Sequence, residues 1–312
     1  MQFEVTQLTK SFGEKQVLKG IGFKTQSGKA FGLLGRNGAG KTTTIRIVMG
    51  VFPADSGQVL LDGKPINHAK TDIGYLPEEH GLYPKIKIGE QLAYLAELRG
   101  VSRRHSKASI AHWMARLEMQ AFTNRKLDTL SKGNQQKIQL VAALVTNPDF
   151  VILDEPFSGL DPVNAALLKD VVKELIAQGK IVLFSSHQMN YVEEFCDAIA
   201  ILHQGEIVLS GEIDAIKRSY DRSVMVVHAQ NLAAVAEVCR GKLSDMVRSV
   251  DLRENLLLAR LAAPGEKLPF MAALAQQGID VDSVAVFEPS LNDIFVQYTG
   301  DDKADDTQEV PA

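Results

Sequence analysis

The chain has 312 residues, with 34 Lys and Arg against 38 Asp and Glu, and a formal net charge of -4. Residues 301–312 hold five of the acidic side chains and one basic side chain, so 33 acidic and 33 basic residues remain in 1–300. A neutral body lacks the excess of Lys and Arg that coats DNA through bulk charge, and no direct nucleic-acid partner is expected. With 45% hydrophobic and 23% charged residues, the chain is typical of folded globular proteins.

Membrane-spanning and secretion signals are missing from the sequence. It contains no run of about 18 uncharged apolar residues, and its N-terminus lacks the apolar core of a signal peptide. Cys196 and Cys239 are not spaced like metal ligands, so we interpret them as small buried residues of a reduced compartment, with a disulfide as the less favoured alternative. We expect a cytoplasmic protein that would need a partner to act at a membrane.

The first sixty residues alternate short strand-like runs with Gly-rich and polar turns. A buried run then leads through a Gly-rich turn into the helical segment Thr42–Met49, the context that a phosphate-binding loop requires. The strand-like runs are Phe3–Leu8, Val17–Phe23, Lys29–Leu34 and Gln58–Leu61.

Apolar residues at helical spacing dominate the next part of the chain and predict a helical insertion at about residues 85–146. Its helices are expected at Lys87–Arg99, Ser106–Met119 and Asn134–Thr146. Two continuous apolar runs follow, Phe150–Leu153 and Ile181–Ser185, and such runs are typical of buried strands in a parallel sheet.

The character of the chain changes after about residue 221. The pattern there predicts a βαββαβ order followed by a helix, the plan of small α+β domains. We therefore expect a large N-terminal domain at 1–221, an accessory domain at 222–300 and an acidic disordered tail at 301–312. The strand-like runs are Ser223–Ala229, Met246–Leu252, Asn255–Leu261 and Val281–Phe287, and the helical ones are Asn231–Arg240, Glu266–Gln277 and Leu291–Tyr298.

Residues 35–42 read GRNGAGKT and fit the phosphate-loop pattern G-x-x-x-x-G-K-[ST]. The glycines let backbone N–H groups approach phosphate oxygens, and the following helix adds the positive end of its dipole. Lys41 is expected to reach the β- and γ-phosphates and Thr42 to ligate Mg²⁺; the alternative is a chance Gly-rich turn. The predicted nucleotide contacts are Gly35, Asn37, Gly38, Ala39, Gly40, Lys41, Thr42 and Thr43.

The run Phe150–Leu153 ends in two neighbouring carboxylates, Asp154 and Glu155. A buried strand would hold Asp154 rigidly enough to support a Mg²⁺ shell. Glu155 would then orient or deprotonate the water that attacks the γ-phosphate. The alternative is that these carboxylates are an ordinary acidic strand end. The presence of a phosphate loop in the same chain disfavours it.

In its order of motifs the chain resembles the ATP-binding cassette (ABC) ATPases. GRNGAGKT is followed by LSKGNQQK at 130–137, FVILDEP at 150–156, SGLDP at 158–162 and SSH at 185–187. The resemblance covers residue 1 to about 219. It implies an α/β P-loop NTPase core with an antiparallel β subdomain and a helical insertion, to which the small α+β domain is added.

The resemblance also implies roles for single residues. Phe12 matches the aromatic that stacks on adenine, with burial in the core as the alternative. His187 matches the residue that senses the γ-phosphate, with simple packing as the alternative. Ser131, Gly133 and Asn134 lie in the family signature, which contacts ATP bound to the other subunit, and Gly159 and Asp161 match the loop that couples the two sites.

Two positions depart from the family pattern. Glu78 stands where the family usually has Gln in the loop that links Mg²⁺ to the helical insertion, and a carboxylate there can bind the metal but adds negative charge beside the phosphates. The signature reads SKGN in place of SGGQ, so Lys132 adds a cation near the partner's nucleotide.

From these motifs we expect a subunit that hydrolyses ATP and dimerises around it, with a second copy of this chain or a different subunit as the other half. It would power a separate membrane permease from the cytoplasmic face of the inner membrane. The stretch Lys85–Arg125 would receive the permease, and EPSLNDIFVQYTG at 288–300 adds to a resemblance to sodium- or drug-extruding ABC-2-type exporters. A soluble ABC ATPase acting on ribosomes or nucleic acid, and a regulatory protein without hydrolysis, stay open as alternatives.

Overall fold

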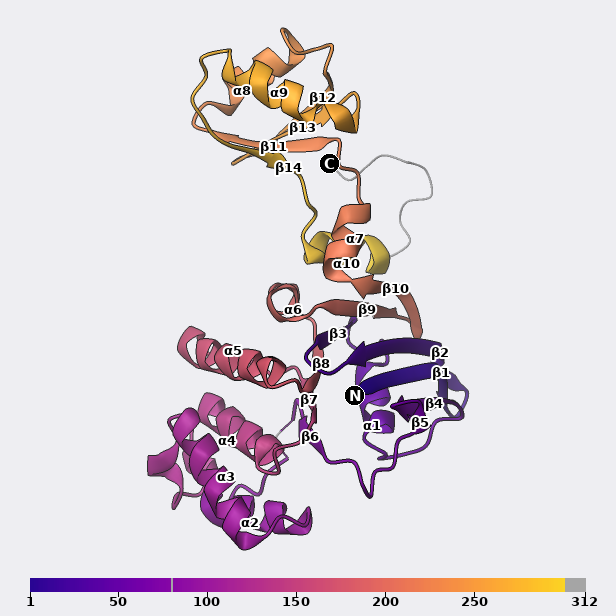
Figure 1. Cartoon of the computed structure of the whole chain (residues 1–312), viewed down its shortest axis with the longest axis vertical. Coiled ribbons are helices and arrows are strands. Elements are labelled where there is room, and N and C mark those ends of the chain that lie inside the picture. The colour runs from indigo at the N-terminus through magenta and orange to yellow at the C-terminus, as the bar shows by residue number, and fades with distance from the viewer. Residues whose placement is uncertain (80, 301–312) are drawn as a thin grey trace. The chain divides into compact units, whose positions relative to one another are not determined.

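The computed structural model describes residues 1–79 and 81–300, which form two compact units (Figure 1). One unit comprises Met1–Ile213 with Gln297–Thr299, and the other comprises Asp214–Val296. The boundary predicted after residue 221 lies just beyond a short helix, α7 (Ile213–Ser219), of which all residues except Ile213 belong to the second unit. The tail predicted at 301–312 lies outside the described residues.

The centre of the first unit is a sheet whose strands follow the order β10-β9-β3-β8-β7-β6 in the described residues. All of its neighbouring pairs are parallel except β9 and β10. The predicted buried runs form β3, β7 and β8, which are buried throughout because other elements cover both faces of the sheet. The strands are β3 (Ala30–Leu34), β6 (Ile73–Leu76), β7 (Phe150–Asp154), β8 (Ile181–Ser186), β9 (Ala198–His203) and β10 (Glu206–Glu212).

A second, antiparallel sheet packs with helix α1 (Lys41–Val48) against the central sheet (Figure 1). The two sheets share one apolar core, in which the rings of Phe3 and Phe150 lie 4.7 Å apart and those of Phe23 and Phe31 stack at 4.9 Å. This core anchors the segment that carries the phosphate loop. The strands follow the order β2-β1-β4-β5 and span β1 (Gln2–Phe12), β2 (Lys15–Gln26), β4 (Ser56–Leu61) and β5 (Lys64–Pro65).

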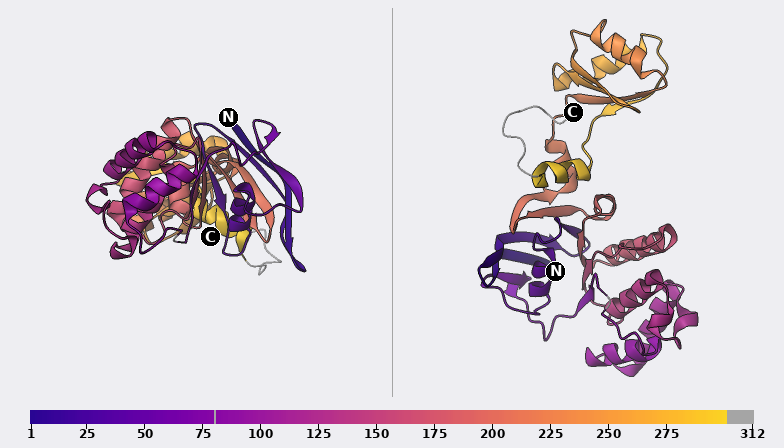
Figure 2. Two further views of the ribbon diagram at one scale, coloured as in Figure 1. Left: turned by 90° about the horizontal axis from the view of Figure 1, so that it is seen from below. Right: turned by 180° about the vertical axis from the view of Figure 1, so that it is seen from behind.

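Helices α2 to α5 lie on the other side of the central sheet from the N-terminal strands, as Figures 1 and 2 show from opposite directions. Besides α1, this unit has α2 (Ile88–Leu98), α3 (Arg103–Arg116), α4 (Lys132–Leu144), α5 (Pro162–Ala177) and α6 (Met189–Phe195), with single 3₁₀ turns at Gln120–Phe122 and Leu127–Thr129.

Three elements differ from those predicted from the sequence, and capping residues or a glycine account for the differences. Helix α3 begins at Arg103 and not at Ser106, because the side chain of Ser102 accepts a hydrogen bond from the His105 N–H and caps the helix there. Helix α5, which the periodicity did not indicate, begins after the N-cap Asp161. Strand β6 was also missed, since it is short and contains Gly74.

The second unit has the predicted βαββαβ order followed by a helix. Its strands pair in the order β12-β13-β11-β14, and α8 and α9 cover one face of this sheet (Figure 1). Cys239 is buried in this core, and Cys196 is buried in the first unit; both are free thiols, as expected. The elements are β11 (Val224–Ala229), α8 (Leu232–Arg240), β12 (Val247–Leu252), β13 (Leu257–Leu261), a 3₁₀ turn (Pro264–Glu266), α9 (Lys267–Ala275), β14 (Val281–Val286) and α10 (Leu291–Thr299).

Within residues 1–79 and 81–300, no helix is both long enough and apolar enough to cross a bilayer.

Gly74 in β6 packs where a side chain has no room. A β-carbon there would lie 2.5 Å from the Ala143 carbonyl oxygen and 2.7 Å from Pro148 Cγ. Because the first of these atoms belongs to the backbone, we expect Gly74→Ala to lower the free energy of unfolding by about 1–3 kcal/mol in a urea titration. Gly265→Ala is the control, since a β-carbon there meets no heavy atom within 4 Å. Equal losses for the two variants would contradict the prediction.

Candidate functional site

The predicted phosphate loop connects β3 to α1 and is shaped by its glycines. Gly38 and Gly40 have φ angles of 81° and 116°, which side chains rarely tolerate. A β-carbon on Gly35 would lie 2.5 Å from the Leu202 carbonyl oxygen, so the loop also packs closely on β9. Helix α1 starts at Lys41, and its first N–H groups have no acceptor within the helix. The loop therefore presents backbone donors and a helix dipole to an anion.

A cleft of 420 Å³ opens over this loop and brings the predicted motifs together. Its wall contains residues from the phosphate loop, the end of β7 and the loop after β6, which are far apart in the sequence. Gly35 and Ala39 are part of the loop but do not line the cleft. The lining residues are Lys15, Val17, Arg36, Asn37, Gly38, Gly40, Lys41, Thr42, Thr43, Glu78, Asp154 and Glu155.

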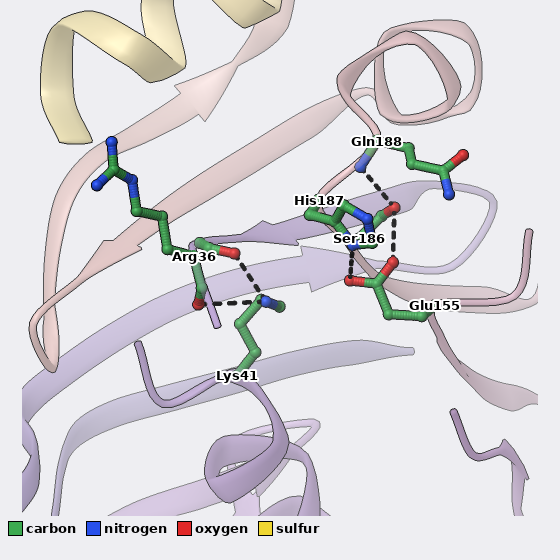
Figure 3. Close-up of polar contacts among 7 residues, drawn as sticks. Arg36, Lys41, Glu155, Ser186, His187 and Gln188 are labelled. Atoms are coloured by element: carbon green, nitrogen blue, oxygen red, sulfur yellow. Dashed lines mark hydrogen bonds and ion pairs between the residues drawn. The ribbon is translucent and has the colours of Figure 1, made fainter. Parts of the chain in front are cut away.

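Lys41 is held at the loop by carbonyl groups. Its ammonium donates hydrogen bonds to the Gly35 carbonyl oxygen at 2.7 Å and to the Arg36 carbonyl oxygen at 3.5 Å, and the residue is 7% exposed (Figure 3). The positive charge thus sits beside the donors of the loop. A polyphosphate bound there would offer it stronger, charge-assisted hydrogen bonds.

Asp154 ends β7 and is 2% exposed. Burial raises the pKa of its carboxyl, whereas the nearby Ser185 hydroxyl lowers it; the charges of Glu78 and Glu155 raise it further, and the charge of Lys41 opposes them. Ser185 lies opposite Asp154 on the neighbouring strand, and its side chain is buried. Carboxylate oxygens such as those of Asp154 and Glu78 are the ligand type that suits a hard divalent cation.

The protein by itself does not complete such a cation site. In the described residues no group of three or more His, Cys, Asp or Glu side chains could hold a metal ion. Thr42, Glu78 and Asp154 nevertheless face the same cleft. This fits an ion that takes one or two carboxylates and completes its shell with water and the phosphates of a nucleotide.

Glu155 is fixed by both its backbone and its carboxylate. Its φ angle is 49°, and its N–H donates to the Ser185 carbonyl oxygen at 2.8 Å. Oε1 lies 2.9 Å from Nδ1 of His187, and Oε2 accepts a hydrogen bond of 3.1 Å from Ser186 Oγ (Figure 3). A carboxylate that borders the phosphate-binding cleft in this way can accept a proton from water.

Several predicted residues do not line this cleft. Phe12 is 51% exposed at the end of β1, with its ring 5.5 Å from that of Phe52 and edge-on to it, so burial in the core is excluded. Ser131 caps α4 and accepts from the Asn134 N–H at 3.4 Å. Gly133, also in α4, is buried. Because the signature residues do not reach the cleft of their own chain, any nucleotide contact they make must be with another subunit.

Sequence reasoning missed Lys15, Val17, Arg36 and Ser186 at this site. Lys15 pairs with Phe12 at the β1–β2 turn and lines the cleft, but its neighbourhood carries no motif. Ser186 lies directly before His187 and was treated only as part of the SSH motif. The position of Lys15 and of Ser186 at this site follows from how the strands pair, which no local sequence motif indicates.

Two family models match the chain. Residues 18–158 match the model described as ABC transporter, and residues 211–299 match that of the DrrA1-3-like ATP-binding protein C-terminal domain. The chain is 39% identical over 306 residues to the uncharacterized ABC transporter ATP-binding protein YhaQ of Bacillus subtilis, covering 95% of this chain and 98% of YhaQ. The chain belongs to the ABC transporter ATP-binding proteins. It is therefore an ATPase of this family, as its motifs predicted.

Other members and solved structures agree with this. The linearmycin resistance ATP-binding protein LnrL of Bacillus subtilis is 33% identical, covering 94% of this chain and 96% of LnrL. A Nod factor export ATP-binding protein I of Burkholderia orbicola is 29% identical, with 95% and 96% covered. The solved structure of an ATP-binding subunit of an ABC transporter superposes with a TM-score of 0.65 at 29% identity, covering 70% of this chain and 93% of that one. The predicted fold class of this ABC protein is confirmed.

Proposed function

We propose that this ABC protein is the ATP-hydrolysing subunit of an exporter: it binds MgATP in the 420 Å³ cleft, pairs with a second subunit and drives a separate membrane permease. The observation that carries the proposal is the wall of the cleft, which joins the phosphate loop and Lys41 to the carboxylate of Glu155. Binding and hydrolytic groups thus face one volume. This disfavours a regulatory protein that binds ATP without hydrolysing it.

Different residues at the cleft have different roles in hydrolysis. The phosphate loop and Lys41 hold the phosphates, and Glu155 orients a water molecule and accepts its proton. His187, whose side chain is 54% exposed, can leave Glu155 and contact the γ-phosphate. Mg²⁺ bound beside Thr42, Asp154 and Glu78 would neutralise charge on the phosphates.

Glu78 tests the metal part of this proposal. We expect Glu78→Gln to raise the Mg²⁺ concentration needed for half-maximal binding of a fluorescent ATP analogue about tenfold, because a neutral amide is a weaker ligand than a carboxylate. The exposed Glu79, one residue later, gives the matched control Glu79→Gln. A Mg²⁺ dependence that is the same in all three proteins would remove Glu78 from the metal site.

The position of the signature supports a paired state. Ser131 and Gly133 begin α4, away from the cleft of their own chain. In a head-to-tail dimer, each signature would close the cleft of the other subunit over the γ-phosphate. ATP would then join the two subunits, and its hydrolysis would release them. A second copy of this chain is the partner we propose.

Blocking hydrolysis should trap this dimer. We expect Glu155→Gln with MgATP to elute as a dimer in size-exclusion chromatography, because the neutral amide cannot accept the proton of the water and the nucleotide stays intact. With ADP the same variant should be a monomer. Glu237→Gln, an exposed position in the second unit, should behave as wild type. A variant that stays monomeric at saturating MgATP would contradict the paired state.

Exposed apolar side chains mark the surface that we assign to the permease. Ile86, Tyr94 and Leu98 lie inside the stretch predicted to receive it and are 41%, 54% and 65% exposed, and Tyr83, just before that stretch, is 56% exposed. The neighbouring groove between α2 and α3 has a volume of 750 Å³. Concentrated exposed apolar area is typical of protein contacts. The export direction is supported by the names of LnrL and the Nod factor protein.

Membrane fractionation tests the complete proposal. We expect the chain to sediment with inner membranes only when its permease is co-expressed, and to be accessible there from the cytoplasmic side. The double variant Tyr94→Glu, Leu98→Glu should stay in the supernatant while it still binds ATP, because a charged side chain cannot be buried in an apolar contact without a partner. Leu268→Glu, at a 77% exposed position of the second unit, is the control. Sedimentation with ribosomes instead would favour the soluble alternative.

A further inference from the structure

The Ser186 hydroxyl links the carboxylate of Glu155 to the backbone of Gln188. It lies at the end of β8 and is 1% exposed. Ser186 Oγ accepts a hydrogen bond of 3.0 Å from the Gln188 N–H and donates one of 3.1 Å to Glu155 Oε2 (Figure 3). A hydroxyl has one proton to donate. Because the Gln188 N–H can only donate, the proton of Ser186 is directed at Glu155.

The two oxygens of the Glu155 carboxylate have unlike partners. Oε1 pairs with His187, whose side chain is 54% exposed and can turn away from it. Oε2 pairs with Ser186, which is buried and belongs to a strand that hydrogen-bonds to both of its neighbours. One partner can therefore be exchanged during a reaction cycle, whereas the other stays in place.

We propose that Ser186 is a positioning residue for ATP hydrolysis, an inference that rests on the proposed function. It holds Oε2 of Glu155, so that Oε1 faces the attacking water when His187 turns to the nucleotide. The oxygen of the water then bonds to the γ-phosphorus, its proton moves to Oε1, and the bond from the γ-phosphorus to the bridging oxygen of ADP breaks. Ser186 keeps its own proton throughout.

The hydrogen bond from the Gln188 N–H to Ser186 also ties the carboxylate of Glu155 to the start of α6. Gln188 is the N-cap residue of α6, and its side chain makes no capping hydrogen bond. The Gln188 N–H is instead fixed by the same hydroxyl that holds Glu155. The orientation of the carboxylate is therefore tied to the turn that carries His187, so both hydrolytic side chains depend on one buried hydrogen-bond chain.

Steady-state ATPase kinetics of Ser186→Ala, Ser186→Thr and wild type test the proposal. We expect Ser186→Ala to lower kcat about 10- to 100-fold, because a carboxylate that rotates is poorly placed for the water. KM for MgATP and the affinity for a fluorescent ATP analogue should change less than about twofold, since Ser186 does not line the cleft. Ser186→Thr keeps the hydroxyl and should recover most of kcat.

Ser210→Ala is the matched control. Ser210 also lies in a strand and its hydroxyl also makes a hydrogen bond, but it is exposed on β10 and donates to the Ile199 carbonyl oxygen, far from Glu155 in the sheet order. Its kcat should equal that of wild type. If Ser186→Ala does not fold, Ser186→Cys replaces it, because a thiol is a weaker donor of similar shape and should give an intermediate kcat.

A double-mutant comparison separates positioning from a general structural effect. In a Glu155→Gln background, Ser186→Ala should leave the residual rate unchanged, because the group through which it acts is already gone. A loss by the same factor in both backgrounds would overturn the proposal, and so would a Ser186→Ala variant with wild-type kcat. A wild-type protein that binds ATP but does not hydrolyse it would overturn the proposed function and this inference together.

Discussion

The parallel pairing of β3, β8 and β7 is the constraint on which the rest of the site depends. Leu34 lies opposite Ser186, and Asp154 opposite Ser185, so the three strands end at one edge of the sheet. Groups that follow those ends therefore meet, although the phosphate loop precedes the other two by more than a hundred residues. Open parallel sheets bind ligands at this edge, where the phosphate loop, the acidic pair and His187 come together here.

Electrostatics give that edge its chemistry. Three carboxylates, those of Glu78, Asp154 and Glu155, border the cleft together with the buried ammonium of Lys41. Burial raises the pKa of Asp154, because a carboxylate is less stable as an ion away from water. A nucleotide brings more negative charge, which the backbone donors of the loop and the basic residues of the cleft wall, Lys15, Arg36 and Lys41, can offset.

The site also separates fixed from movable parts. Glu155 adopts a left-handed backbone conformation, which costs about 1–3 kcal/mol for a side-chain-bearing residue and is maintained by the bond to the Ser185 carbonyl oxygen. The buried Ser186 holds one carboxylate oxygen, while the exposed His187 holds the other. Strain at Glu155 is thus supported by the strand next to it, and the movable contact is left on the solvent side.

The sequence alone determined the parts of this protein that depend on neighbouring residues. The phosphate loop, the buried strands β3, β7 and β8, the three helices of the insertion and the βαββαβ order could be read from it, because glycine spacing and apolar periodicity are local properties. The tertiary structure alone decided that Lys15 lines the cleft, that Phe12 is exposed and that Ser186 holds Glu155. These facts follow from strand register and packing between distant segments, and no local pattern encodes which side chains such pairing will bring together.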